Sequence, residues 1–175
     1  MLFPVLTAGA EVENSIRVTV QNEGDLLTVN SEAFVRASPE EVWAVMIDFD
    51  HMARFISNLR SSRVLSRDGG KVKVEQKGRA SAGLLFFDFE SVREMDLTPY
   101  SQIHSRQISG SMAKFDGTTV LRQEGDLTRI ESRVLAVPGT WVPPIFGKRF
   151  IESETREQFS ELLAEIARRQ EAAKR

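Results

Sequence analysis

The feature that most constrains the fold is a long region in which apolar and polar residues alternate with a period of two. It extends from about residue 60 to residue 137 and is divided by turn signals such as RDGG, LTPY and QEGD. Alternation of this kind is typical of strands with one buried face. It predicts six strands, at about 60–67, 71–79, 84–97, 103–109, 115–124 and 127–137. Because their connections are short, we expect consecutive strands to pair as antiparallel hairpins in one curved sheet.

A long amphipathic helix is predicted after these strands, at about 144–172. Acidic residues stand early in this segment and basic residues late, which suits the helix dipole. At 100° per residue, one stripe of the helix contains Ile151, Thr155, Phe159, Leu162, Leu163 and Ile166. We expect this stripe to pack against the concave face of the sheet.

The region before the sheet predicts a strand pair and two short helices. Strands at 16–20 and 26–36 flank the turn sequence NEGD. Ser38 is suited to cap a helix that begins at Pro39, and a second short helix is expected through 50–56. The order of elements predicts a single α+β domain over 16–172, in which a curved antiparallel sheet of about seven strands wraps around the C-terminal helix. Residues 1–15 are predicted to form an N-terminal arm.

Charge, cysteine content and hydropathy exclude several classes of function. The 175-residue chain has 23 basic and 25 acidic residues and no basic block, so it has no electrostatic footprint for nucleic acid. It contains no cysteine, which excludes disulfides and thiolate nucleophiles. No apolar run approaches the roughly 20 residues that are needed to cross a bilayer.

The first ten residues, MLFPVLTAGA, leave two compartments open. They lack the basic region of a signal peptide, and on the sequence as given we expect a cytoplasmic protein. If residues 1–10 are the tail of a truncated signal peptide, with TAGA near its end, the protein is periplasmic.

Residues that commonly carry catalysis are few. His51 and His104 lie on different predicted elements and show no metal-ligand spacing to carboxylates, so we predict no metal site and no cofactor. Arg106 is a polar candidate for a pocket, with Arg133 as an alternative. If either points inward, its guanidinium could hold a carbonyl or carboxylate group among apolar walls.

Phenylalanines give the clearest sign of an apolar interior. Phe87 and Phe89 alternate on one face of a predicted strand, Phe115 follows on a later strand, and Phe159 faces inward from the long helix. The residues alone leave two interpretations open. These side chains fill a solid core, or they line a cavity, since one helix cannot easily fill so long a curved sheet.

Three stretches carry a family resemblance. They are ASPEEVWAVMIDFDHMARFISNLRSSRVL (37–65), FDFESVREM (87–95) and WVPPIFGKRFIESETREQFSELLAEI (141–166). Together they resemble the polyketide cyclase/START-type (SRPBCC, helix-grip) superfamily, and the third is similar to the Trp-Val-Pro-Pro entry of one bacterial branch. The resemblance extends over 16–170. One departure is Ser57, where many relatives have proline.

The resemblance implies a helix-grip fold with a deep, mostly apolar cavity, and so favours the cavity interpretation. In relatives this cavity holds lipids, sterols, aromatic polyketides or isoprenoid quinones, and coenzyme Q-binding proteins are similar in architecture. We therefore predict a non-catalytic carrier or chaperone of a hydrophobic small molecule, a lipid or isoprenoid quinone. The alternatives are a cyclase/aromatase-like enzyme and a ribosome- or protein-interaction module. The only tyrosine, Tyr100, falls in a predicted turn, which counts against the enzyme.

Two more residues belong to the predicted cavity lining. Phe55 ends the second short helix, where relatives form part of the cavity mouth. Thr155 interrupts the apolar stripe of the long helix. Its hydroxyl either bonds back to the helix carbonyl four residues earlier or contacts a ligand head group.

The stretch PGTWVPPIFGKRF (138–150) places Trp141, Phe146 and Phe150 before or within the start of the long helix. Helical phase puts Phe146 and Phe150 roughly opposite Phe159. Either regular helix begins only after about Gly147, or this end carries apolar surface outward. Both versions predict that the three aromatic residues form the rim of the cavity, where they would touch ligand, membrane or a second subunit of a homodimer.

Overall fold

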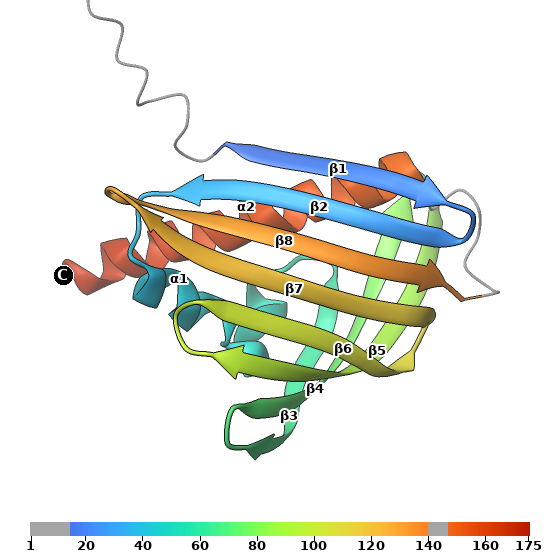
Figure 1. Cartoon of the computed structure of the whole chain (residues 1–175), viewed down its shortest axis with the longest axis horizontal. Coiled ribbons are helices and arrows are strands. Elements are labelled where there is room, and N and C mark those ends of the chain that lie inside the picture. The colour runs from blue at the N-terminus through green and yellow to red at the C-terminus, as the bar shows by residue number, and fades with distance from the viewer. Residues whose placement is uncertain (1–14, 140–146) are drawn as a thin grey trace, which may run out of the picture.

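A computed structural model describes residues 15–139 and 147–175, and an eight-stranded antiparallel sheet is its main element (Figure 1). The strands are β1 Ile16–Glu23, β2 Leu26–Val35, β3 Leu59–Asp68, β4 Lys71–Ala82, β5 Leu85–Thr98, β6 Gln102–Gly110, β7 Met112–Glu124 and β8 Leu127–Pro138. Their order in the sheet is β1-β2-β8-β7-β6-β5-β4-β3. The predicted α+β class is confirmed, with eight strands in place of about seven.

The N-terminal hairpin belongs to the same sheet as the six later strands. Val18 and Val20 of β1 and Leu27 and Val29 of β2 are buried in alternation, as the sequence predicts. Gly24 adopts a φ of +60° in the turn, a conformation that favours glycine. β2 then pairs with β8 over nine residue pairs, from Leu27 to Val35. This pairing places the N-terminal hairpin beside β8, the last strand in the sequence.

Two short helices follow β2, as predicted. Helix α1, Pro39–Met46, begins with a capping box, in which the Glu41 backbone N–H donates to Ser38 Oγ at 3.2 Å and the Ser38 N–H donates to Glu41 Oε2 at 2.8 Å. The 3₁₀ helix η1, Phe49–Arg54, comes two residues later. Trp43 and Phe49 are buried, so both helices close one end of the molecule against the sheet.

The long helix α2, Lys148–Ala173, crosses the inner face of the sheet, and its C-terminal end lies beside α1 (Figure 1). Regular helix begins directly after Gly147, which agrees with the first of the two sequence-based alternatives. Leu163 and Ile166 of the predicted stripe are fully buried. In the part of the chain that is described, no helix is both long and apolar enough to cross a membrane.

The solid part of the core lies under α1, η1 and the C-terminal part of α2. Its buried members come from helices and from most strands of the sheet. They include Val35, Val42, Trp43, Val72, Val74, Met95, Ile103, Leu121, Ile130, Leu163 and Ile166. Large side chains at these inward positions fill the space between α2 and the sheet at this end of the molecule. At the other end, beside the N-terminal part of α2, the space is not filled.

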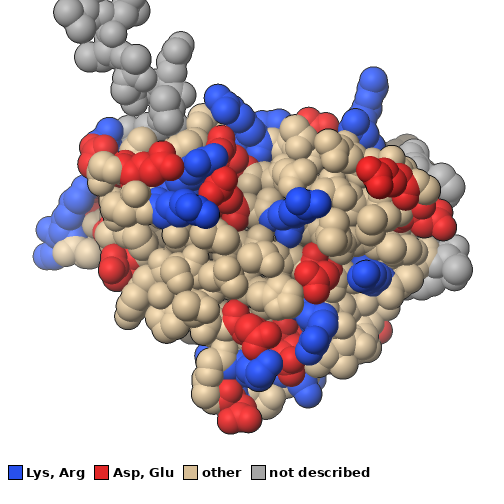
Figure 2. Space-filling view, viewed as in Figure 1, with Lys and Arg blue, Asp and Glu red and all other residues tan. Residues whose placement is uncertain are grey.

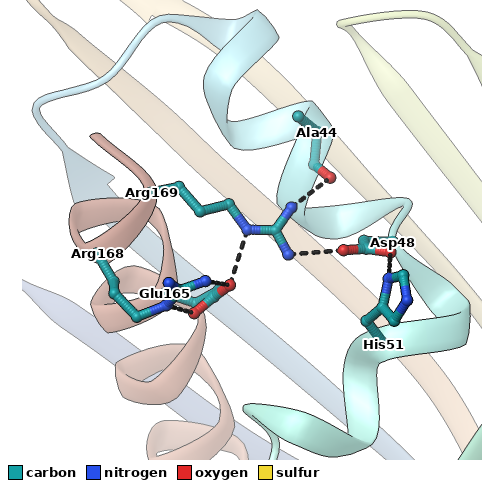
Figure 3. A network of polar contacts seen from close by, with 6 residues as sticks. All are labelled: Ala44, Asp48, His51, Glu165, Arg168 and Arg169. Carbon is teal, nitrogen blue, oxygen red and sulfur yellow. Dashed lines mark hydrogen bonds and ion pairs between the residues drawn. The ribbon is translucent and has the colours of Figure 1, made fainter. Parts of the chain in front are cut away.

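A polar network ties α2 to the loop between α1 and η1 (Figure 3). Glu165 accepts from Arg168 Nε at 2.6 Å and from Arg169 Nε at 2.7 Å, and only 8% of its side chain is exposed. The other end of the Arg169 guanidinium donates to Asp48 Oδ2 at 2.7 Å. Asp48 in turn contacts His51 Nδ1 at 2.7 Å. Arg169 thus clamps two elements that lie more than a hundred residues apart in the sequence.

Glu165→Gln is expected to lower the free energy of unfolding by about 1 kcal/mol at neutral pH and to have no effect in strong acid. Hydrogen bonds from Arg168 and Arg169 hold the pKa of Glu165 at about 2, below its ordinary value of 4.5. A carboxyl with a lower pKa in the folded state stabilises the fold above the unfolded pKa. That contribution is lost as the pH falls from 4.5 to about 2. Solvent around the exposed Arg168 screens the pair, which keeps the figure small.

Urea unfolding of both proteins near neutral pH and near pH 2 measures this effect. Glu171→Gln is the matched control, because Glu171 is exposed and pairs with Lys174 near the same helix end. A stability gap between wild type and Glu165→Gln that stays constant over this pH range would contradict the prediction.

Candidate ligand-binding cavity

A cavity of about 520 Å³ lies between the inner face of the sheet and the N-terminal part of α2. Small side chains on five neighbouring strands make this space: Ser31 on β2, Ser132 on β8, Thr119 on β7, Ser105 on β6 and Ser91 on β5. Register pairs Ser31 with Ser132 and Ser132 with Thr119, so the small residues form a row across the sheet. Volume is left open where the inward positions change from branched apolar to small polar residues.

Apolar side chains form most of the remaining wall. Alternation along β5 presents Phe87, Phe89, Ser91, Arg93 and Met95 to the cavity. Other elements contribute further apolar side chains, which include Phe49, Met52, Ile56, Ile103 and Leu162. A concave, mostly apolar space of this size with a few polar groups is typical of a site for a small hydrophobic molecule.

Arg93 is the only basic residue among the described residues that line the cavity. Its guanidinium donates to Gln76 Oε1, and its central carbon lies 5.1 Å from the centroid of the Phe115 ring. Burial lowers the pKa of Arg93 to about 10, and no acidic neighbour in the described chain offsets this effect. Arg93 therefore stays charged at neutral pH without a carboxylate partner, and its remaining N–H groups can donate to a carbonyl or acidic group.

The structure places six of the ten predicted site residues on the cavity wall. They are Phe87, Phe89, Phe115, Phe150, Thr155 and Phe159. Two others, Trp141 and Phe146, lie outside the described residues. The last two, Phe55 and Arg106, lie elsewhere in the fold.

Arg106 does not line the cavity, and the prediction that it could do so is wrong. On β6 the inward positions are Ile103, Ser105 and Gln107, which puts Arg106 on the outer face of the sheet. There its guanidinium donates to Glu94 Oε1 of the neighbouring strand at 2.9 Å. Figure 2 shows acidic and basic side chains interspersed over this outer face. Arg133 lies on the same outer face, in a depression lined by residues of β1, β2, β7 and β8, and it is not part of the cavity lining.

Phe55 belongs to the closed end of the molecule. Its ring packs against the solid core and lies under Arg169, whose guanidinium carbon is 5.8 Å from the ring centroid. Phe55 is not among the residues that line the cavity, whereas its neighbours Met52 and Ile56 are. Its assignment to the cavity mouth is corrected accordingly.

The sequence contained a signal for Arg93 that the prediction did not use. The alternation that places Phe87 and Phe89 on one face continues without interruption to Ser91, Arg93 and Met95. Ser91 and Ser105, which resemble ordinary polar residues of a sheet surface, also point inward. Their small size, and not their chemistry, is what opens the space.

A second polar pair, Asn58 and Glu154, lines the cavity between the start of β3 and α2. Asn58 Nδ2 donates to Glu154 Oε2 at 2.9 Å. Burial raises the pKa of Glu154, and the nearby charges of Glu157 and Glu161 raise it further, while the hydrogen bond from Asn58 lowers it. The net direction is upward, so this carboxyl is protonated more easily than an exposed glutamate.

Residues with the commonest catalytic side chains do not gather in the cavity. Neither histidine and no tyrosine belongs to its described lining. His51 takes part in the α2 clamp, and His104 on the outer face lies 3.2 Å from both carboxylate oxygens of Asp116. Tyr100 occupies the β5–β6 turn, as predicted, and packs edge-on against Trp43. The described residues contain no group of three or more side chains that could hold a metal ion.

The β4–β5 hairpin carries apolar side chains into solvent next to the cavity wall. Leu84, Leu85 and Phe86 at its tip are all exposed, and Leu84 is completely so. Phe86 precedes Phe87, which lines the cavity. Phe86 also contacts the Arg79 guanidinium, whose carbon lies 4.0 Å from the ring centroid. Three consecutive exposed large apolar residues at a hairpin tip are typical of a surface that contacts another apolar phase.

Comparison with known proteins places this architecture in a defined group. A family model described as polyketide cyclase/dehydrase and lipid transport matches residues 35–163. No curated protein is significantly similar in sequence.

Solved structures of several related proteins have the same fold. A STAR-related lipid transfer protein from Xanthomonas axonopodis superposes with a TM-score of 0.74 at 14% identity, covering 87% of this chain and 93% of the other. The ZhuI aromatase/cyclase from Streptomyces sp. R1128 gives 0.72 at 18% identity, covering 85% and 98%. A START superfamily protein from Mycobacterium smegmatis gives 0.68 at 14% identity, covering 81% and 97%. At these identities the likeness is one of fold alone.

Proposed function

The chain belongs to the polyketide cyclase/dehydrase and lipid transport family, and from this premise we propose that it binds and carries a hydrophobic small molecule without changing it. The observation that carries the proposal is the apolar cavity of about 520 Å³ with the charged, half-buried Arg93 on its wall. Its volume is in the range that accommodates small organic ligands. The ligand class is a lipid or an isoprenoid quinone, because either offers a long apolar body and a polar oxygen for Arg93.

A cyclase-type enzyme is the second candidate function, and one observation favours it. Glu154 is a cavity-lining carboxyl with a raised pKa, which is a property of many general acids. The family description includes polyketide cyclase and dehydrase as well as lipid transport. We place the carrier first because the described lining has neither histidine nor tyrosine to share proton transfer with Glu154.

The exposed hairpin tip suits a carrier that exchanges its ligand with a membrane. Leu84, Leu85 and Phe86 would enter the interfacial region of a bilayer, and Phe87 beside them already faces the cavity. We propose transient membrane contact through this tip. A homodimer that covers the same surface is the competing arrangement.

Native mass spectrometry of gently purified protein, with organic extraction of anything bound, tests the carrier function. We expect an apolar molecule to remain bound and to be released chemically unchanged. Thr155→Trp should fill the cavity and reduce the bound fraction about tenfold. Thr155 lines the cavity, whereas Ser160 on the same helix is exposed, so Ser160→Trp is the matched control that should retain the ligand.

Two outcomes would contradict the proposed function. One is wild-type protein that neither copurifies with an apolar molecule nor binds an added one. The other is turnover of a polyketide-like substrate that is lost in Glu154→Gln, which would favour the enzyme.

A further inference from the structure

The structure assigns Asn58 and Glu154 as a second polar subsite of the cavity, which binds a hydroxyl group of the ligand. This inference rests on the proposed function, because it concerns a ligand held in the same cavity. It adds the requirement that the ligand carry a hydroxyl group, whereas Arg93 requires only a carbonyl or acidic group. Both residues line the cavity, and they come from elements 96 residues apart in the sequence.

The side-chain amide of Asn58 has an unsatisfied polar atom. Nδ2 donates to Glu154 Oε2 at 2.9 Å, whereas Oδ1 is buried and has no partner among the described residues. A buried acceptor without a donor costs free energy, so the site has a place for one more hydrogen bond. Because Asn58 lines the cavity, we assign the missing donor to a group of the ligand.

A hydroxyl group fits this place whichever way the amide is oriented. If Glu154 is ionised, it accepts from Nδ2, and Oδ1 needs a donor. If Glu154 is protonated and the amide is reversed, Nδ2 needs an acceptor instead. Since a hydroxyl group both donates and accepts, it satisfies either arrangement. A ketone or an ether oxygen satisfies only the second.

The backbone holds Asn58 in place before any ligand binds. Its carbonyl oxygen accepts from the Arg79 N–H at 2.8 Å, and Leu59 pairs with Gly78 at the start of β3. The Phe89 side chain lies directly above Gly78. A polar group that is fixed in this way loses little conformational entropy when it binds a ligand.

The two polar subsites are separated along β4. The guanidinium of Arg93 reaches Gln76, and Asn58 contacts the strand beside Gly78, two residues further along. Two residues of a strand extend over about 7 Å. Within the proposed class of apolar ligands, the inference therefore selects a molecule that carries a carbonyl or acidic group for Arg93 and a separate hydroxyl group for Asn58 and Glu154.

The test compares two aromatic acids that differ by one hydroxyl group, 2-naphthoate and 6-hydroxy-2-naphthoate, by calorimetric titration. Both carry a carboxylate for Arg93, and the second places a hydroxyl at the far end of the rings. We expect wild-type protein to bind the hydroxylated acid about fivefold more tightly. Asn58→Leu should bind both acids equally, at the affinity of wild type for 2-naphthoate.

Asn30→Leu is the matched control, because Asn30 lies on the outer face of β2. It should keep the fivefold preference. If Asn58→Leu is too unstable to titrate, Glu154→Leu serves in its place, since it removes the other half of the subsite. Thermal unfolding of each variant shows which one is folded.

The outcomes separate this inference from the proposed function. If 2-naphthoate binds but the hydroxyl group adds nothing, the subsite is overturned and the carrier function stands. The subsite is also overturned if Asn58→Leu and Glu154→Leu both keep the preference. Protein that binds neither acid, and no other apolar molecule, overturns both.

Discussion

Arg93→Met is expected to weaken the binding of 2-naphthoate about a hundredfold, the largest effect on ligand binding of any single change in the cavity. Hydrogen bonds to a charged group contribute about 1.5–3 kcal/mol each, and one such bond accounts for a factor of 10–150. Arg93 is the only basic residue of the described lining, so no neighbour can replace it. Calorimetric titration of wild type and variant measures the loss.

The same substitution is expected to stabilise the free protein, by about 1 kcal/mol. Among the described residues, the guanidinium has one neutral hydrogen-bond partner and no carboxylate partner, and burial lowers its pKa to about 10. Methionine has a similar length and fills the space without a charge. Residues that lower the stability of the free protein but increase its affinity for a ligand are typical of binding sites.

Arg106→Met is the control for both measurements. Arg106 pairs with Glu94 on the exposed outer face of the sheet. Exposed pairs contribute little, so neither affinity nor stability should change by more than a few tenths of a kcal/mol. An Arg93→Met protein that is less stable than wild type and keeps its affinity would show that Arg93 is structural.

Gly78→Ala is expected to lower the free energy of unfolding by about 3 kcal/mol, the largest stability effect among these predictions. A Cβ atom at this position would lie 2.2 Å from the backbone oxygen of Asn58 and 2.4 Å from the ring of Phe89. The ring can rotate away, but the oxygen belongs to the backbone bond that joins Asn58 to Arg79. Relief of the clash therefore requires β3 to move away from β4.

Urea unfolding measures the loss, and Gly117→Ala is the comparison. Gly117 lies on the cavity wall, where the atom closest to a Cβ would be the end of the Val134 side chain, at 3.1 Å. That contact is relieved by a small shift, so the loss should stay below about 1 kcal/mol. If the two variants are equally stable, the backbone oxygen of Asn58 does not lie as close to Gly78 as the structure shows.

Much of the fold could be predicted because its signals are local. Alternation with a period of two identified six strands, and Ser38 with Glu41 marked the start of α1. The period of the C-terminal segment identified the buried stripe of α2 that ends in Leu163 and Ile166. Each of these signals depends on residues within one or two turns of each other.

The outward position of Arg106 was harder to predict, because apolar residues occupy both phases of β6. Ile103 points inward, while Ile108 is exposed. The β5–β6 register shifts between Val92 and Arg93, where Ser109 and Gln107 are the successive partners and Ile108 is skipped. Because Ile103 and Ile108 lie in opposite phases, alternation on β6 does not show whether Arg106 points into the cavity.

The sequence by itself determined the α+β class, the antiparallel strands, the capped short helix and the buried side of elements such as β2 and α2. Periodicity and capping are properties of neighbouring residues, so they can be recognised in a single chain. Only the tertiary structure decided that Ser31, Ser132 and Thr119 lie in one row and open a cavity. It also decided that Asn58 meets Glu154. These contacts join residues far apart in the sequence, and they depend on strand register and helix position, which local patterns do not encode.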